Sequence, residues 1–135
     1  MTIQVRVDSV HRLRYAAASG ILTDADVLEV YAGVLSDPGY DPALDMVFDC
    51  TAVERLDVKP ETIAHIAALV ARADRDIPED AHPRAAIVAP ADALFGMARM
   101  YQAHRELQHA PRRYFVCRTM DEAVRWLGLA EESGW

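Results

Sequence analysis

Two short apolar runs constrain the fold of this chain most strongly. The runs "MVFDCTA" (46–52) and "RAAIVA" (84–89) are apolar at nearly every position rather than at alternate positions. A strand without a polar side has to be covered on both faces, as central strands of a helix-covered sheet are. We therefore predict that both runs form interior strands, and that residues 46–49 and 86–89 are among the most deeply buried.

The segments around these runs predict the element order ββαβαβαβα. Alternating apolar and polar residues at the start of the chain, followed by a second apolar run that ends at Gly20, indicate an antiparallel hairpin. Four amphipathic segments with capping residues or proline at their starts indicate helices. The expected strands are 3–8, 13–19, 46–52, 84–89 and 112–118. The expected helices are one that starts after Thr23 and is stopped by Pro38 and Gly39, followed by 60–77, 91–108 and 120–128. This order predicts an α/β fold with a mixed, mostly parallel five-stranded sheet flanked by four helices.

Length and composition are those of one globular domain, which we assign to residues 1–135. The chain is 52% apolar and 26% charged, and no apolar run approaches the roughly 20 residues of a membrane span. Its N-terminus alternates instead of forming a signal-peptide core, which predicts a cytoplasmic protein. Two cysteines, Cys50 and Cys117, fall within apolar runs, so we expect reduced core residues and neither a disulfide nor a catalytic thiol.

The net charge of −7 argues against nucleic acid as the main partner. The charge is uneven, because the segment 82–118 carries six arginines against two carboxylates. We interpret this surplus as solvated strand ends and helix faces. The five histidines offer no three-ligand spacing, so neither a metal nor another cofactor is expected.

The predicted order and four segments resemble the SpoIIAA-like fold. This fold is shared by the STAS anti-sigma-factor antagonists and other small bacterial proteins, with the CRAL-TRIO lipid-binding domains as distant relatives. The resemblance covers residues 2–129 and rests on "SGILTDADVL", "MVFDCTAVERLD", "AIVAPADALFGMARM" and "VCRTMDEAVRWLG". It implies a single STAS-type domain that acts by contacting a protein partner.

The resemblance also identifies a strand–helix junction that carries a phosphorylation switch in the antagonists. Asp49 ends the matching strand, and Asp57 matches the aspartate that precedes the phosphorylated serine. Val58 stands in place of that serine, and a valine has no hydroxyl to modify. We therefore interpret Asp57 as a helix-capping or loop-bonding residue, with Thr51 and Thr62 left as hydroxyls that could carry a switch by another route.

The helix predicted over 91–108 contains the remaining candidates. Helical spacing places six residues on the side that would face the sheet: Gly96, Met97, Met100, Tyr101, Ala103 and Leu107. Phe95 then falls on the polar side beside Arg99, with Asp92 in the first turn. An aromatic residue next to an arginine is typical of interfaces, but Phe95 could equally tuck under a neighbouring loop as satellite core.

Two functions follow from this pattern. The first is a non-enzymatic interaction or regulatory module that contacts a protein partner or a second copy of itself in a homodimer. Its candidate surface comprises Asp49, Asp57, Asp92, Phe95 and Arg99. The alternative is a small protein that binds an apolar ligand or lipid between helices and sheet. An enzyme ranks third, because only the location of Asp49 and Asp57 at the strand ends supports it.

Overall fold

A computed structural model describes residues 2–129 and confirms the predicted α/β fold. Met1 and residues 130–135 of the predicted domain lie outside the described residues. The strands are β1 (Thr2–Asp8), β2 (Leu13–Thr23), β3 (Asp45–Asp57), β4 (Arg84–Val88) and β5 (Arg113–Cys117). The helices are α1 (Asp24–Ser36), α2 (Pro60–Ala73), α3 (Asp92–Leu107) and α4 (Met120–Leu127), and a 3₁₀ turn, η1 (Asp74–Asp76), follows α2.

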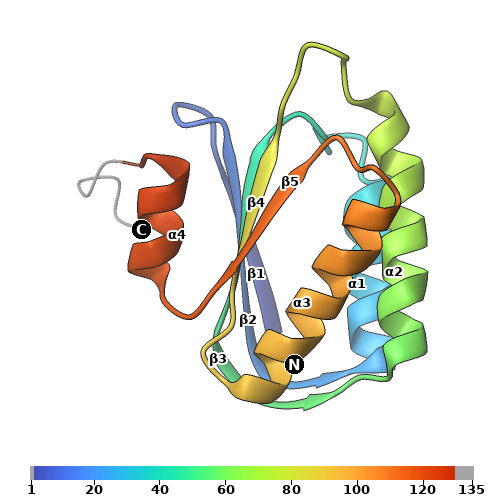
Figure 1. Cartoon of the computed structure of the whole chain (residues 1–135), viewed down its shortest axis with the longest axis vertical. Helices are drawn as coiled ribbons and strands as arrows, with labels where there is room; N and C mark the ends of the chain where they lie inside the picture. The colour runs from blue at the N-terminus through green and yellow to red at the C-terminus, as the bar shows by residue number, and fades with distance from the viewer. Residues whose placement is uncertain (1, 130–135) are drawn as a thin grey trace.

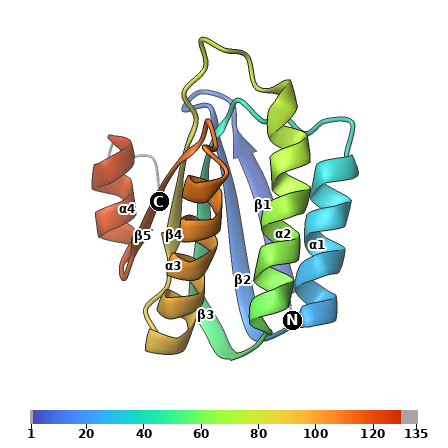
Figure 2. The same ribbon diagram turned by 45° about the vertical axis from the view of Figure 1, so that its right-hand side comes forward.

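The five strands form one sheet in chain order, β1-β2-β3-β4-β5. Strands β1 and β2 pair antiparallel, and every later pair is parallel. Helices α1, α2 and α3 lie side by side on one face, while α4 alone lies on the other (Figures 1 and 2). Both runs predicted as interior strands, now β3 and β4, have neighbours on both sides.

Strands β2 and β3 are longer than predicted. The sequence reading ended the second strand at Gly20, yet β2 continues to Thr23 with a register irregularity next to this glycine. Gly20 adopts a φ of 80°, a conformation that glycine tolerates without a Cβ clash. The two strands therefore run on together, with Thr23 opposite Asp57, beyond the end of β4.

The core has one layer on each side of the sheet. On the α4 side, Leu13, Val47 and Ala86 are fully buried against α4. On the other side, the three helices pack through Ile66, Ala67 and Val70 of α2 and Leu94, Ala98 and Tyr101 of α3. Helix α1 contributes no fully buried residue, so this helix is the most loosely packed of the three on its face.

The predicted orientation of α3 is correct for Tyr101, which is buried, but wrong for Gly96, Met100, Ala103 and Leu107, which are exposed. Its buried residues are Leu94, Ala98, Tyr101 and Arg105, whereas Met100 and Leu107 are 37% and 80% exposed. The prediction failed because it assigned a charged side chain to solvent. Arg105 is instead 1% exposed and forms an ion pair with the buried Asp74.

Candidate functional site

Asp49 lies on the α4 side of β3 and is 7% exposed. Its carboxylate accepts the hydroxyl of Tyr15 at 2.5 Å and the backbone N–H of Thr51 at 2.9 Å. Burial, followed by the bond to Asp49, raises the pKa of Tyr15 to about 12. The hydrogen bond from Tyr15 connects β2 with β3. Both oxygens of the Asp49 carboxylate therefore serve as acceptors for neighbouring groups of the protein.

Asp57 is exposed at the end of β3, and the following Val58 is 9% exposed. The carboxylate that lies at the start of α2 belongs to Asp24, the first residue of α1, and not to Asp57. Its Oδ1 accepts the backbone N–H of Lys59 at 2.9 Å. A hydrogen bond from the Thr62 side chain, together with that N–H, lowers the pKa of Asp24.

The predicted capping role of Asp57 therefore belongs to Asp24. Lys59 is the N-cap of α2 and makes no side-chain capping bond, so the helix takes its anion from a residue 35 positions earlier. A helix N-terminus favours such an anion. Sequence reasoning used Asp24 only for the first turn of α1, because the proximity of the two helix starts is a tertiary contact.

Asp92 lies in the first turn of α3, as predicted, and Phe95 and Arg99 follow on the same helix. The side chain of Asp92 accepts a hydrogen bond from Nη1 of Arg118 at 2.7 Å, and the same nitrogen bonds the Pro90 carbonyl at 2.9 Å. The Arg118 guanidinium lies 4.0 Å from the centre of the Phe95 ring. Phe95 is also half-buried against the cluster around Leu94. The cation over its ring belongs to Arg118, which lies in the β5–α4 connection.

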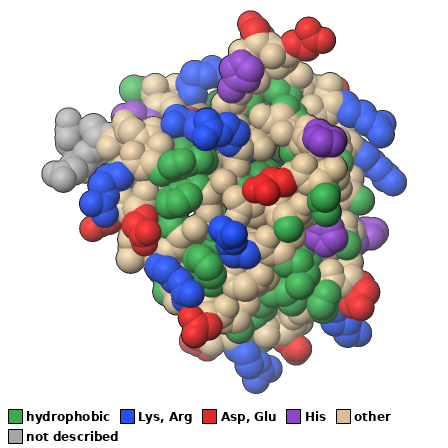
Figure 3. All heavy atoms as spheres, viewed as in Figure 1, with side chains coloured by type: hydrophobic (Ala, Val, Ile, Leu, Met, Phe, Trp, Pro, Cys, Tyr) green, Lys and Arg blue, Asp and Glu red, His purple; other side chains and the backbone are tan. Residues whose placement is uncertain are grey.

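Beside these residues, α3 exposes a second row of side chains that are small or apolar. This second row consists of Ala93, Gly96, Met100, Ala103 and Leu107. We call these five residues, together with Phe95 and Arg99, the α3 surface. The row has the three- and four-residue spacing of one helix face. A Cβ placed on Gly96 would meet nothing within 4 Å. Figure 3 shows hydrophobic side chains among charged ones on the face that carries α3.

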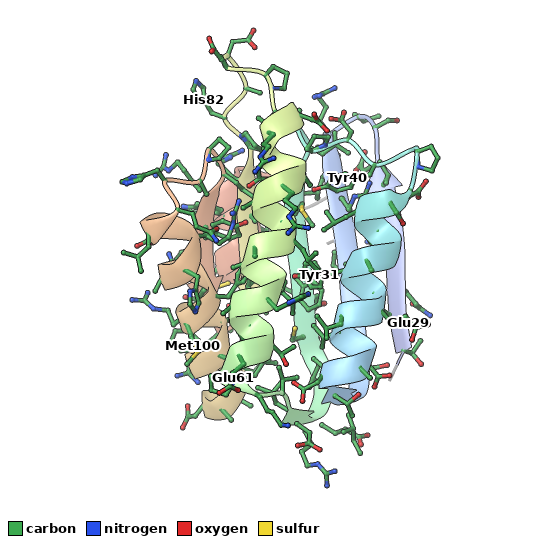
Figure 4. All side chains as sticks on the ribbon, turned by 90° about the vertical axis from the view of Figure 1, so that its right-hand side faces the viewer. Glu29, Tyr31, Tyr40, Glu61, His82 and Met100 are labelled. Atoms are coloured by element: carbon green, nitrogen blue, oxygen red, sulfur yellow. The ribbon has the colours of Figure 1, made fainter. Side chains whose placement is uncertain are left out.

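The space between the sheet and helices α1, α2 and α3 contains three apolar cavities. Their volumes are about 80, 50 and 30 Å³. Tyr31 of α1 and Phe48 of β3 line all three, so the cavities are neighbours. Figure 4 shows Tyr31 between α1 and α2 and Tyr40 near the end of α1, with Glu29 on the outer side of that helix. Each of the three cavities is smaller than the 300 Å³ or more of a typical drug-sized ligand site.

Three arginines are buried near the amino ends of the parallel strands. Arg105 donates from Nε to the Tyr114 hydroxyl at 3.0 Å and pairs with Asp74. Arg112 donates to the carbonyl oxygens of Leu44 at 2.8 Å and Pro42 at 2.6 Å. Arg14 is 6% exposed, stacks 4.9 Å from the Tyr40 ring centre, and its buried Nε has no hydrogen-bond partner.

This arrangement differs from the predicted surface distribution of the arginine-rich segment 82–118. Arg105 and Arg112 are 1% and 4% exposed. Arg84, at the start of β4, bonds Asp45 at 2.9 Å. Sequence reasoning also missed Arg14, because an alternating strand that begins with Leu13 places its even positions in solvent, whereas α1 and the α1–β3 connection cover this side of β2.

The described residues offer no obvious metal centre or membrane span. Within residues 2–129, no three His, Cys, Asp or Glu side chains lie close enough to hold a metal ion. No helix in this part of the chain has the length and apolar character needed to cross a bilayer. Cys50 and Cys117 are free and buried, in agreement with the prediction of unpaired core cysteines.

Comparison of the sequence with models of known protein families gives no match, and comparison with curated proteins gives no similar sequence. The resemblance to the SpoIIAA-like family therefore remains a prediction from the sequence pattern. The geometry above is the basis for assigning a function.

Proposed function

We propose that this protein is a non-enzymatic interaction module that binds a protein partner, or a second copy of itself, through the α3 surface. The observation that carries the proposal is the exposure of Leu107 and Met100, at 80% and 37%, on a helix that already buries another face against the sheet. A helix with an apolar row outside its core-facing side has a surface to cover. Anchors at this spacing are those with which helices dock onto partner grooves or helices.

The composition of the surface supports close helix contact. Gly96 and Ala103 let a partner backbone approach, while Met100 can adapt its shape to the contact. Phe95 and Arg99 at one side add the residue types that carry much of the binding energy in interfaces. The resemblance to the STAS antagonists supports the same class of function, in which a small domain docks on a partner protein.

We do not assign a phosphorylation switch to the start of α2. Val58 has no hydroxyl and is 9% exposed. Asp24 already supplies a carboxylate to the first turn of this helix, and a phosphate added next to it would meet like charge. The module we propose is therefore one whose docking is not regulated at residues 57–60.

Photo-crosslinking from within the α3 surface tests the proposal. A photoreactive amino acid replaces Ala103, which is exposed in the row between Met100 and Leu107, and in a control it replaces Ala32, which is exposed on α1. We expect irradiation to join the Ala103 derivative, but not the Ala32 derivative, to one partner or to a second copy. Adding Leu107→Glu to the Ala103 derivative should abolish that product.

A second measurement compares charge insertion at two exposed apolar sites. Leu107→Glu should weaken the association at least tenfold, while Val10→Glu, at a position 86% exposed in the β1–β2 hairpin, should leave it unchanged. Both variants should unfold at the temperature of the wild type, because neither side chain belongs to the core. Equal crosslinking from Ala103 and Ala32, or association insensitive to Leu107→Glu, would exclude the α3 surface.

A further inference from the structure

We infer that Arg14 and the cavity between β1, β2 and α1 form a binding site for a monocarboxylic acid with an alkyl chain of intermediate length. The site lies away from the α3 surface and does not depend on the function proposed for it. The inference starts from the charge of Arg14. A guanidinium keeps its charge under all ordinary conditions, so its burial requires a compensating partner.

The described part of the chain does not supply that partner. No carboxylate within residues 2–129 forms an ion pair with Arg14; the ion pairs in this range involve His11, Arg12, Arg84, Arg105 and Arg118. The buried Nε has no acceptor, and the contact recorded for the guanidinium is with the face of Tyr40. The other two buried arginines have acceptors, either a carboxylate or two backbone carbonyls. Arg14 is thus the buried arginine with a bond left to make.

The cavity at Arg14 is otherwise apolar. Its walls are Ile3 and Val5 of β1, Ala16 of β2, and Val30 and Val34 of α1, with Met46 and Phe48 of β3. Val5 is 45% exposed while it lines this space, so the cavity reaches the surface between β1 and α1. One cationic group at the end of an apolar wall matches a ligand with one anionic group and a hydrocarbon chain.

The size of the space restricts the ligand further. This cavity measures about 30 Å³, and its neighbours measure about 50 and 80 Å³. Tyr31 and Phe48 line all three, so a narrow chain that extends from one cavity into the next has to displace these two side chains. A planar carboxylate fits a guanidinium side-on with two hydrogen bonds and needs less room than a phosphate. We therefore assign a monocarboxylate with a chain of intermediate length.

Entry of the hydrocarbon chain requires α1 to move. This helix contributes no fully buried side chain, but Tyr31 and Leu35 pack against the core cluster around Ile66, so the movement costs part of that packing. Val34 lines both the cavity at Arg14 and its neighbour. A larger side chain at Val34 would block the path of the hydrocarbon chain without removing the cation.

Titration calorimetry of the full chain with octanoate tests the inference, with 1-octanol and butyrate as comparison ligands. We expect saturable binding of one octanoate, with at least tenfold weaker binding of 1-octanol, which lacks the charge, and of butyrate, which lacks most of the chain. These comparisons use the unmodified protein, so they do not depend on the folding of a variant. Equal affinity for octanoate and 1-octanol, or no saturable binding of octanoate, would overturn the assignment.

Two substitutions then locate the site. Arg14→Met should weaken octanoate binding at least tenfold and raise the melting temperature of the ligand-free protein, because it removes a buried guanidinium whose Nε has no hydrogen-bond acceptor. Val34→Trp should weaken binding while keeping Arg14. Arg6→Met, on the exposed strand β1, is the matched control and should bind octanoate as the wild type does. Octanoate binding that survives Arg14→Met would place the ligand elsewhere.

Discussion

The buried ion pair between Asp74 and Arg105 should be among the most costly interactions in the molecule to break singly. The side chains are 4% and 1% exposed, so neither charge can recover its hydration if the other is removed. Arg105 would keep two neutral acceptors, the Tyr114 hydroxyl at 3.0 Å and the Gln108 amide oxygen at 2.6 Å. Asp74→Leu should therefore lower the free energy of unfolding by about 3 to 5 kcal/mol, and Arg105→Met by a similar amount.

The double variant distinguishes an ion pair from two unrelated losses. With both charges gone, no uncompensated charge is left buried, and replacement of a whole pair by apolar residues is often nearly neutral. Asp74→Leu combined with Arg105→Met should lower the free energy of unfolding by less than either single change. A loss of about 1 kcal/mol should remain, because the Tyr114 hydroxyl and the Gln108 amide oxygen no longer receive a hydrogen bond from Arg105. Urea unfolding followed by circular dichroism gives the free energies, and Arg99→Met on the exposed side of α3 is the control.

Additive costs in the double variant, or single costs below about 1 kcal/mol, would refute this reasoning, because a surface pair behaves in that way. The test bears on the orientation of α3 as well as on its energetics. If α3 instead presented Met100 and Leu107 to the sheet, Arg105 would lie in solvent and its replacement would cost little.

Three further outcomes are expected. Phe95→Ala should lower the free energy of unfolding by about 2 kcal/mol, below the 3 to 5 kcal/mol of a fully buried phenylalanine, and urea unfolding at two protein concentrations checks whether association changes as well. The pKa of Tyr15 is raised to about 12 in the folded protein. The resulting stability is fully present below the pKa of about 10 that an unfolded tyrosine has, and it is lost as the pH rises through about 12. Tyr15→Phe should abolish this part of the alkaline loss of stability, which urea unfolding at several pH values measures. Burial raises the pKa of Cys50 well above its usual range and that of Cys117 to about 11, so both thiols should react slowly with a disulfide reagent at pH 8 and rapidly in denaturant.

The fold was predictable because its signals are local. Two runs apolar at consecutive positions identified β3 and β4, and capping residues such as Thr23 and Thr119, whose hydroxyls accept N–H bonds in the first turns of α1 and α4, located helix starts. Secondary structure can be predicted from such a sequence because the hydrophobic periodicity, the capping residues and the helix-breaking residues indicate the same elements. The strand ends were less predictable, because the extension of β2 past Gly20 depends on its pairing with β3.

The candidate sites were less predictable because their partners are distant in sequence. Asp74 lies 31 positions before Arg105, and nothing near either residue indicates that a charge is buried. The same holds for Asp49, which accepts the hydroxyl of Tyr15 from another strand. For Arg14, the missing information was that a helix covers its side of the strand, since an isolated alternating pattern assigns such a residue to water.

The strand order also bears on how the chain folds as it is synthesised. Since β1 to β5 lie in the sheet in the order of the sequence, each strand leaving the ribosome pairs with the strand made just before it, and the N-terminal units can assemble first. The bonds from Arg112 to the carbonyls of Leu44 and Pro42 span 68 and 70 positions. They can form only after Arg112 has been synthesised, so the connection between α1 and β3 receives these two bonds well after β3 itself has been made.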